Sequence, residues 1–467
     1  MADARPGPGG VNTGMAQADP VGEAVADALR DMLFGASVEI SHGPHGSRPG
    51  VAADGPGTAV ATSSGSSDWD STILVRLSER AARLVRPGTP NSLTELLRVL
   101  PGAAIRALEQ LRTATGSGPA APALRRAVRD TLAGEVLSSY IAARLDAPES
   151  GSLVAETIEY LIELSGSRVE AHDLTHGVVI AGALHDTPRI ELRYPDDLRA
   201  VKRAPLLFDG RRSVLVVDPG GRARTELQRH RLGRLGGTSP PSAAEGWPES
   251  GSLVAEVTRV LGGVGFYVRA DRSIWTFADG QPLIVRRGEH WTAFPLELAA
   301  SIENMIGGGA AASLVARAAF MISARPEGAI LAIVDQPSVI DGVVPLKDRY
   351  DLRDTIDPTA LRPETRLHHL IDADDLDEQT LVRLATLDGA TILDRHGALI
   401  AYGAIVTTAD SEHEGARTAA ARTLSTVAAV VLKVSVDGDI TIFQSGAEVT
   451  TLLGHPAHAT RRVEVAR

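Results

Sequence analysis

Two short segments in the last third of the chain carry residue types that bind cations and phosphates. In the first, Asp388 precedes Gly389 and Ala390, where an apolar run that predicts a β-strand begins. An aspartate at a strand end is suited to holding a divalent cation, and the glycine after it allows a ligand or another backbone to approach closely. Taken alone the pattern is weak, because Asp-Gly is also a common turn dipeptide.

The second segment follows a polar loop and opens a predicted helix with Gly415, Ala416, Arg417 and Thr418. A helix start offers free amide donors and the positive end of the helix dipole. The guanidinium and hydroxyl groups add donors that suit phosphate oxygens. Together the two segments predict a nucleotide site in which Asp388 is the candidate ligand for Mg²⁺ or Mn²⁺.

The order and spacing of these pieces resemble the diadenylate cyclase domain of DisA-type proteins. The residues that carry the resemblance are 388–403 (DGATILDRHGALIAYG), 415–417 and the strand-like segment 430–442. The likeness covers about residues 302–453 and implies a mixed sheet flanked by helices. In that family two domains meet face to face, each holding one ATP, and join the two into cyclic di-AMP. The resemblance implies a catalytic, metal-binding role for Asp388.

The sequence departs from the family pattern at the helix start, where the family has an Arg-His-Arg triplet that grips phosphates. Arg417 matches the first arginine, but Thr418 and Ala419 stand where the histidine and second arginine would be. Each lost charge-assisted contact is worth about 1.5–3 kcal/mol when well made, and phosphoryl-transfer sites depend on such electrostatic stabilisation. Leu387 also replaces a histidine often found before the aspartate. The pattern predicts a nucleotide-binding sensor with little or no cyclase activity.

Two other functions stay open on the sequence. Intact Asp388-Gly-Ala favours an active diadenylate cyclase, whereas the altered triplet also allows a catalytically dead interaction scaffold. His368 and His369 lie near three aspartates and form either a metal site or a polar loop before a helix; the aspartates are Asp372, Asp374 and Asp375. The sequence contains neither the Gly-x-Ser-x-Gly motif of serine hydrolases nor a Walker loop.

Composition limits the classes of protein that remain. The chain has 467 residues, which predicts two to four domains. It has no cysteine, which excludes disulfides and thiolate chemistry. A net charge of −11 argues against nucleic acid or anionic membranes as general partners. No signal peptide or membrane-spanning run is evident, so we expect a cytoplasmic protein with a nucleotide as ligand, whose self-association the sequence leaves open.

The elements upstream of the site predict an α/β protein in four parts and a tail. Residues 1–72 are expected to be mostly disordered with one helix at 20–34, and residues 73–147 to be helical. Residues 148–300 predict a β-rich α+β module with a β-meander at 265–294, residues 301–455 the diadenylate-cyclase-like domain, and 456–467 a tail. The β-rich segment resembles the part that precedes such domains in the predicted sensor family called DACNV.

A nine-residue repeat, Pro-Glu-Ser-Gly-Ser-Leu-Val-Ala-Glu, occurs at 148–156 and again at 248–256. Each copy leads into an apolar-striped stretch, so each predicts the start of a helix. The repeat indicates either two related modules or a local duplication.

Overall fold

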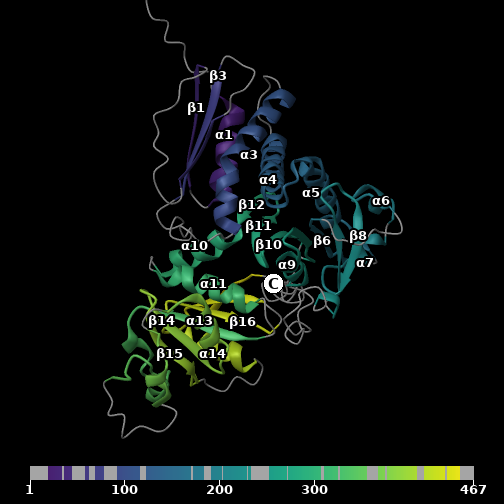
Figure 1. The fold of residues 1–467 in the computed structure, drawn as a ribbon. Helices are drawn as coiled ribbons and strands as arrows, with labels where there is room; N and C mark the ends of the chain where they lie inside the picture. The colour runs from purple at the N-terminus through teal and green to yellow at the C-terminus, as the bar shows by residue number, and fades with distance from the viewer. Residues whose placement is uncertain are drawn as a thin grey trace, which may run out of the picture.

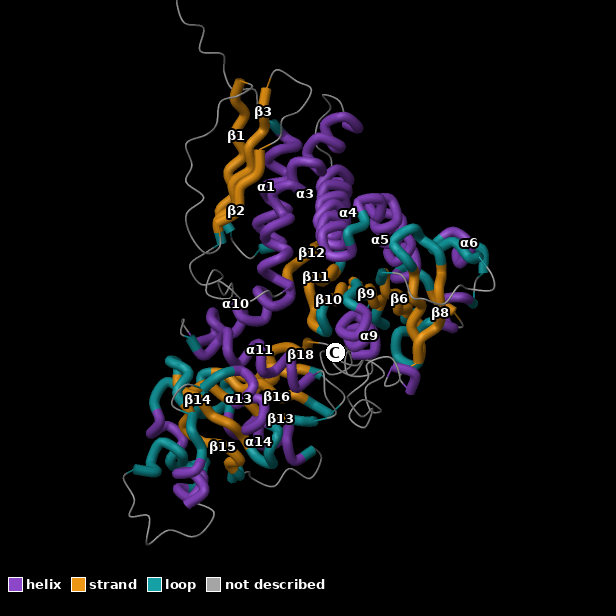
Figure 2. The backbone as a smooth tube through the Cα atoms, viewed as in Figure 1, coloured by secondary structure: helices purple, strands orange, loops and turns teal. Residues whose placement is uncertain are grey.

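The structure is a computed structural model with three sheets and the helices that cover them. It describes residues 19–33, 36–44, 58–62, 69–77, 92–115, 122–169, 172–182, 191–201, 203–228, 230–232, 252–270, 272–306, 310–323, 327–354, 366–373, 376–407, 415–436 and 439–452. Within these ranges the strands form sheets of three, seven and six strands and one two-stranded ribbon. The three-stranded and six-stranded sheets lie at opposite ends of the molecule, as Figures 1 and 2 show.

The amino-terminal part combines a helix with a small antiparallel sheet. Helix α1 (Pro20–Met32) begins at Asp19, whose carboxylate accepts from the Gly22 amide, and it confirms the helix predicted at 20–34. The sheet has the order β1-β3-β2 and consists of β1 (Ser37–Pro44), β2 (Thr58–Thr62) and β3 (Trp69–Arg76).

This sheet corrects two predictions. Disorder was expected across 41–72, and a helix from residue 73. Both predictions are wrong at β1, β2 and β3, which are strands. The central strand β3 is apolar and pairs with β1 on one side and β2 on the other, and this pairing orders the more polar flanking strands. A short apolar run fits a helix and a buried strand equally well; Ile73, Leu74 and Val75 are all buried in the strand. Residues 78–91, the rest of that predicted helix, lie outside the described residues.

Two long helices confirm the predicted helical character of residues 92–115 and 122–145. Helix α3 (Ser92–Thr115) begins at Ser92 and continues without a break through Pro101. Helix α4 (Pro122–Leu145) packs along α3 and also contacts α1. The three helices therefore form one layer, and α1 and α4 join it to the neighbouring seven-stranded sheet through contacts with its edge strand β12.

The seven-stranded sheet occupies the middle of the molecule with the order β12-β11-β10-β9-β6-β7-β8. Strands β9 to β12 are the predicted β-meander, which the structure confirms. The strands are β6 (His176–Ile180), β7 (Ser213–Val217), β8 (Ala223–Gln228), β9 (Val264–Val268), β10 (Ile274–Ala278), β11 (Gln281–Arg287) and β12 (His290–Ala293). The ribbon β4 (Arg168–Val169) and β5 (His172–Asp173) precedes β6, and the short helices α6 (Asp196–Arg199) and α7 (Ala204–Leu207) precede β7.

Both copies of the nine-residue repeat begin helices, as predicted. Helix α5 (Gly151–Ser165) follows a 3-10 turn at Pro148–Ser150 and begins within the first copy, and α9 (Ser252–Leu261) begins within the second copy. The helices cover opposite faces of the same sheet: Val254 of α9 lies against Gly177, whereas Tyr160 of α5 lies against the adjacent His176. Neighbouring residues of a strand point to opposite faces of its sheet. The helices that begin with the repeated sequence therefore cover the two faces of one sheet.

The carboxyl-terminal part is a mixed sheet between two helical layers, which confirms the coarse α/β prediction. The sheet order is β15-β14-β13-β16-β17-β18, in which β13 and β14 are parallel and the other pairs antiparallel. Its strands are β13 (Ala329–Val334), β14 (Ala390–Asp394), β15 (Leu399–Ala404), β16 (Val430–Val434), β17 (Ile440–Gln444) and β18 (Ala447–Leu452). Strand β18 was not predicted.

Helices pack on both faces of this sheet. Leu331 and Ile333 of β13 face α10 (Phe294–Ile306), α11 (Ala311–Ser323) and α13 (Glu378–Ala385). Ile330, Ala332 and Val334 face α14 (Ala416–Leu424) on the other side. Three 3-10 helices lie in the connections, at Pro337–Ile340, Leu346–Asp348 and Leu367–Leu370. Among the described residues, no helix is both long enough and apolar enough to cross a membrane.

Candidate functional site

The two candidate segments come together at one end of the six-stranded sheet. In the parallel pair, Ile330 of β13 lies opposite Ala390 of β14. Asp388 is exposed in the bend that leads into β14 and sits two residues before Ala390, level with Gly328 before β13. Because β16 is antiparallel to β13, its carboxyl end reaches the same place, with Val434 opposite Ala329.

Arg417 connects the start of α14 to this end of the sheet. A Cβ atom built on Gly328 would lie 2.7 Å from Nη1 and 3.0 Å from Cζ of Arg417. The guanidinium therefore covers the backbone just before β13, where a larger residue would displace it. Arg417 and Asp388, which the sequence singled out separately, thus belong to the same edge of the domain.

Lys433 is a further cation at this position that the sequence argument missed. It is half-buried on β16, opposite Ile330, and its Nζ donates to Oγ1 of Thr418 at 3.1 Å. Along β16 the side chain shares the face of Val431, which packs in the core beneath α14. The available signal was a single lysine inside the apolar run Val430–Val434.

The backbone geometry at position 389 requires a glycine. Its φ is +107°, a backbone conformation that residues other than glycine rarely adopt. A Cβ atom there would lie 2.5 Å from the carbonyl carbon of Gly403 and 2.7 Å from the amide nitrogen of Ala404. Here the glycine serves backbone-to-backbone contact between the Asp388 bend and β15, which was one of the two roles expected from the sequence.

Arg417, Thr418 and Ala419, the three residues compared above with an Arg-His-Arg triplet, differ in their environment. Helix α14 begins after Gly415, which has no side chain to cap it, and no other described residue caps it. Ala416 and Arg417 are exposed, Thr418 is half-buried and bonded to Lys433, and Ala419 is buried in the core. The side chain at position 419 therefore faces the interior of the domain.

The carboxylates do not form a metal centre by themselves. No group of three His, Asp or Glu side chains within the described ranges is placed to hold a metal ion. His368 is buried and packs its ring 5.0 Å from that of Tyr402, and this burial, opposed in part by the nearby Arg349 carbonyl, lowers its pKa. It fits the polar-loop interpretation better than metal chelation; Asp374 and Asp375 lie outside the described residues.

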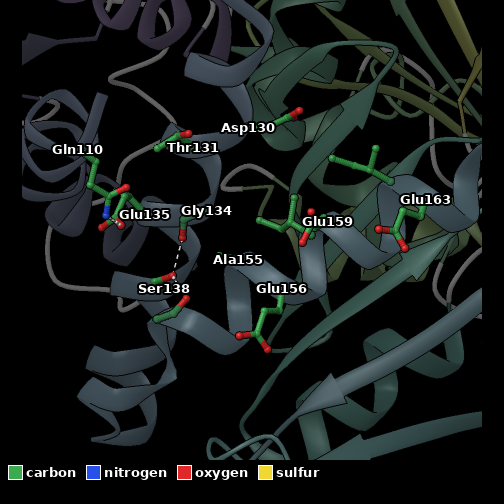
Figure 3. A pocket seen from close by; sticks show the side chains of 13 residues that line it. Gln110, Asp130, Thr131, Gly134, Glu135, Ser138, Ala155, Glu156, Glu159 and Glu163 are labelled. Carbon is green, nitrogen blue, oxygen red and sulfur yellow. Dashed lines mark hydrogen bonds between the residues drawn. The ribbon is translucent and has the colours of Figure 1, made fainter. Parts of the chain in front are cut away.

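A groove of about 570 Å³ lies elsewhere, between α4 and α5. Figure 3 shows its carboxylates, most of which already have partners. Glu135 accepts from Arg106 and Gln110, and Glu159 and Glu163 pair with Arg199. Most of the charges that line the groove are therefore paired within the protein. Gly151, Ala155 and Glu156 of its lining belong to the first copy of the nine-residue repeat, but the groove holds none of the candidate nucleotide-binding residues.

Comparison with known proteins does not assign this chain to a family. No family model matches the sequence, and no curated protein matches it either.

Proposed function

We propose that the protein is a nucleotide-binding sensor, with ATP or a cyclic dinucleotide as its ligand, built on a diadenylate-cyclase-like domain. One observation carries this proposal: Arg417 and Lys433, on different elements, lie on the same face and at the same end of the sheet, beside the start of α14. Two cations and free helix amides favour a phosphate group. The resemblance of residues 388–403 and 415–417 supports an adenine nucleotide as the bearer of that phosphate.

A divalent cation would come to this site with the nucleotide. Mg²⁺ is commonly held by one or two carboxylates together with phosphate oxygens, and Asp388 is the exposed carboxylate at this end of the sheet. Mg²⁺ or Mn²⁺ bound there would neutralise phosphate charge. Asp388 alone would repel a phosphate, so it favours binding only through such an ion.

The altered triplet supports a sensor over a cyclase. The Thr418 hydroxyl is bonded to Lys433, and Ala419 has no polar group and is buried. Neither supplies the charge-assisted contacts that phosphoryl transfer requires.

Equilibrium titration and a product assay on the same protein test the proposal. The full chain is titrated with ATP and with cyclic di-AMP, and ATP is then incubated with Mg²⁺ or Mn²⁺. We expect saturable binding of at least one ligand and little or no cyclic di-AMP. Turnover that is lost in Asp388→Asn would instead favour an active diadenylate cyclase. Absence of both binding and turnover would favour an interaction scaffold.

A further inference from the structure

Lys433 places a positive charge on the partly buried face of β16, beside the start of α14. The residue is half-buried, and its strand neighbours Leu432 and Val434 are fully buried. Its ammonium donates to the Thr418 hydroxyl, and no carboxylate among the described residues pairs with it. A partly desolvated ammonium without a counter-charge is costly. This arrangement favours an anion beside Lys433.

Arg417 is the second cation in the same position. Its guanidinium lies over Gly328, and it forms no ion pair with any residue in the described ranges. Gly328 precedes Ile330 by two residues, about 7 Å along an extended chain, and Ile330 lies directly opposite Lys433. Both charged groups therefore lie over the same strand end and on the same face of the sheet.

We propose that Lys433 is a phosphate-binding residue and that, with Arg417, it allows the nucleotide's phosphates to bind without a divalent cation. This inference rests on the proposed nucleotide site. A divalent ion contributes two positive charges to a phosphate; Arg417 and Lys433 contribute the same number as fixed side chains. Thr418 is a positioning residue, because its hydroxyl oxygen accepts from Lys433 and directs the ammonium toward the helix start.

Calorimetric titration of the full chain with ATP, in Mg²⁺ and in EDTA, tests this inference. The wild-type protein should keep its affinity for ATP in EDTA within roughly tenfold of that in Mg²⁺. Lys433→Met keeps the length of the side chain but removes the charge. It should weaken binding in EDTA roughly ten- to hundredfold, because it removes a charge-assisted contact. Lys433→Arg should retain most of the affinity, and Thr418→Val should lose less than Lys433→Met.

A matched control lies on the same helix. Arg422 is near the other end of α14, where it donates to the Gly446 carbonyl, and Arg422→Ala should bind ATP like the wild type. A melting temperature for each variant separates loss of fold from loss of binding.

The outcomes separate this inference from the proposed function. If ATP binds only with Mg²⁺, the two side chains do not replace the metal ion; if Lys433→Met binds ATP in EDTA as tightly as the wild type does, Lys433 is not a phosphate ligand. Either result overturns this inference and leaves the sensor proposal standing. If neither ATP nor cyclic di-AMP binds in either condition, both proposals are wrong.

Discussion

His176 is buried, and among the described residues neither of its ring nitrogens forms a well-aligned hydrogen bond. Its ring lies 5.7 Å from that of Tyr160 and stacks at 6.4 Å on Tyr194. Burial lowers its pKa from 6.5 to about 4, and the nearby carbonyls of Pro205 and Phe208 oppose this shift only in part. The neutral ring is therefore the form that the fold accommodates.

We expect this residue to make the stability of the protein sensitive to acid. In the unfolded chain His176 takes up a proton near its ordinary pKa, while the folded state resists it. The contribution of His176 to the free energy of unfolding should thus be constant above about pH 6.5 and fall by about 3 kcal/mol on acidification to about pH 4. Urea unfolding at several pH values measures this.

The matched variant is His176→Phe, which keeps a ring but cannot take up a proton. Its free energy of unfolding should change less with pH across the same interval. If the variant and the wild type lose equal stability between pH 6.5 and 4, other groups cause the acid sensitivity.

At the scale of elements, the Asp388 bend depends on close contact between β14 and β15. Gly389→Ala would force a Cβ atom to 2.5 Å from Gly403 at a φ of +107°. We expect a loss of about 2 kcal/mol or more in the free energy of unfolding. Chemical denaturation measures it, with Gly415→Ala as the control, because a Cβ atom there meets nothing within 4 Å. Equal stability of the two variants would show that the contact is easily relieved.

Much of the arrangement of elements around the site followed from local sequence signals. The strand at 390–394 and the helix that begins at Ala416 could be predicted because apolar spacing and glycines mark their limits. The contribution of Lys433 and Gly328 could not, because it depends on the register of β13 against β16 and on where α14 crosses them. The amino-terminal sheet was missed because long-range pairing, rather than local composition, stabilises its polar strands.

At the scale of the whole molecule, one core extends from helix α1 to strand β17. It includes Val25 near the amino terminus and Ile442 near the carboxyl terminus, with Leu298 and Ile302 of α10 between the two larger sheets. The helical layer that was predicted as a separate region shares this core. Asp130 of α4 helps to attach this helical layer to the seven-stranded sheet. Its carboxylate accepts hydrogen bonds from Arg286 at 3.1 Å and from Trp291 at 2.8 Å.

Removing that attachment should destabilise the protein well beyond the loss of a surface ion pair. Asp130→Ala leaves the buried guanidinium of Arg286 without this carboxylate, which costs about 3–5 kcal/mol when a buried pair is broken. Asp27→Ala is the control, because its bond to Arg30 is exposed and worth at most about 1 kcal/mol. Thermal unfolding compares the two variants; equal losses would mean that Asp130 does not secure the helical layer.

A nucleotide bound where α14 meets the six-stranded sheet, as proposed above, would contact Arg417. Arg417 is exposed, so Arg417→Ala should leave the melting temperature nearly unchanged. It should nevertheless weaken binding of ATP or cyclic di-AMP roughly tenfold or more, with or without metal, because the guanidinium is charged at any physiological pH. Calorimetric titration of Arg417→Ala beside the wild type measures this difference. An Arg417→Ala protein that binds both ligands as tightly as the wild type does would contradict the proposed site.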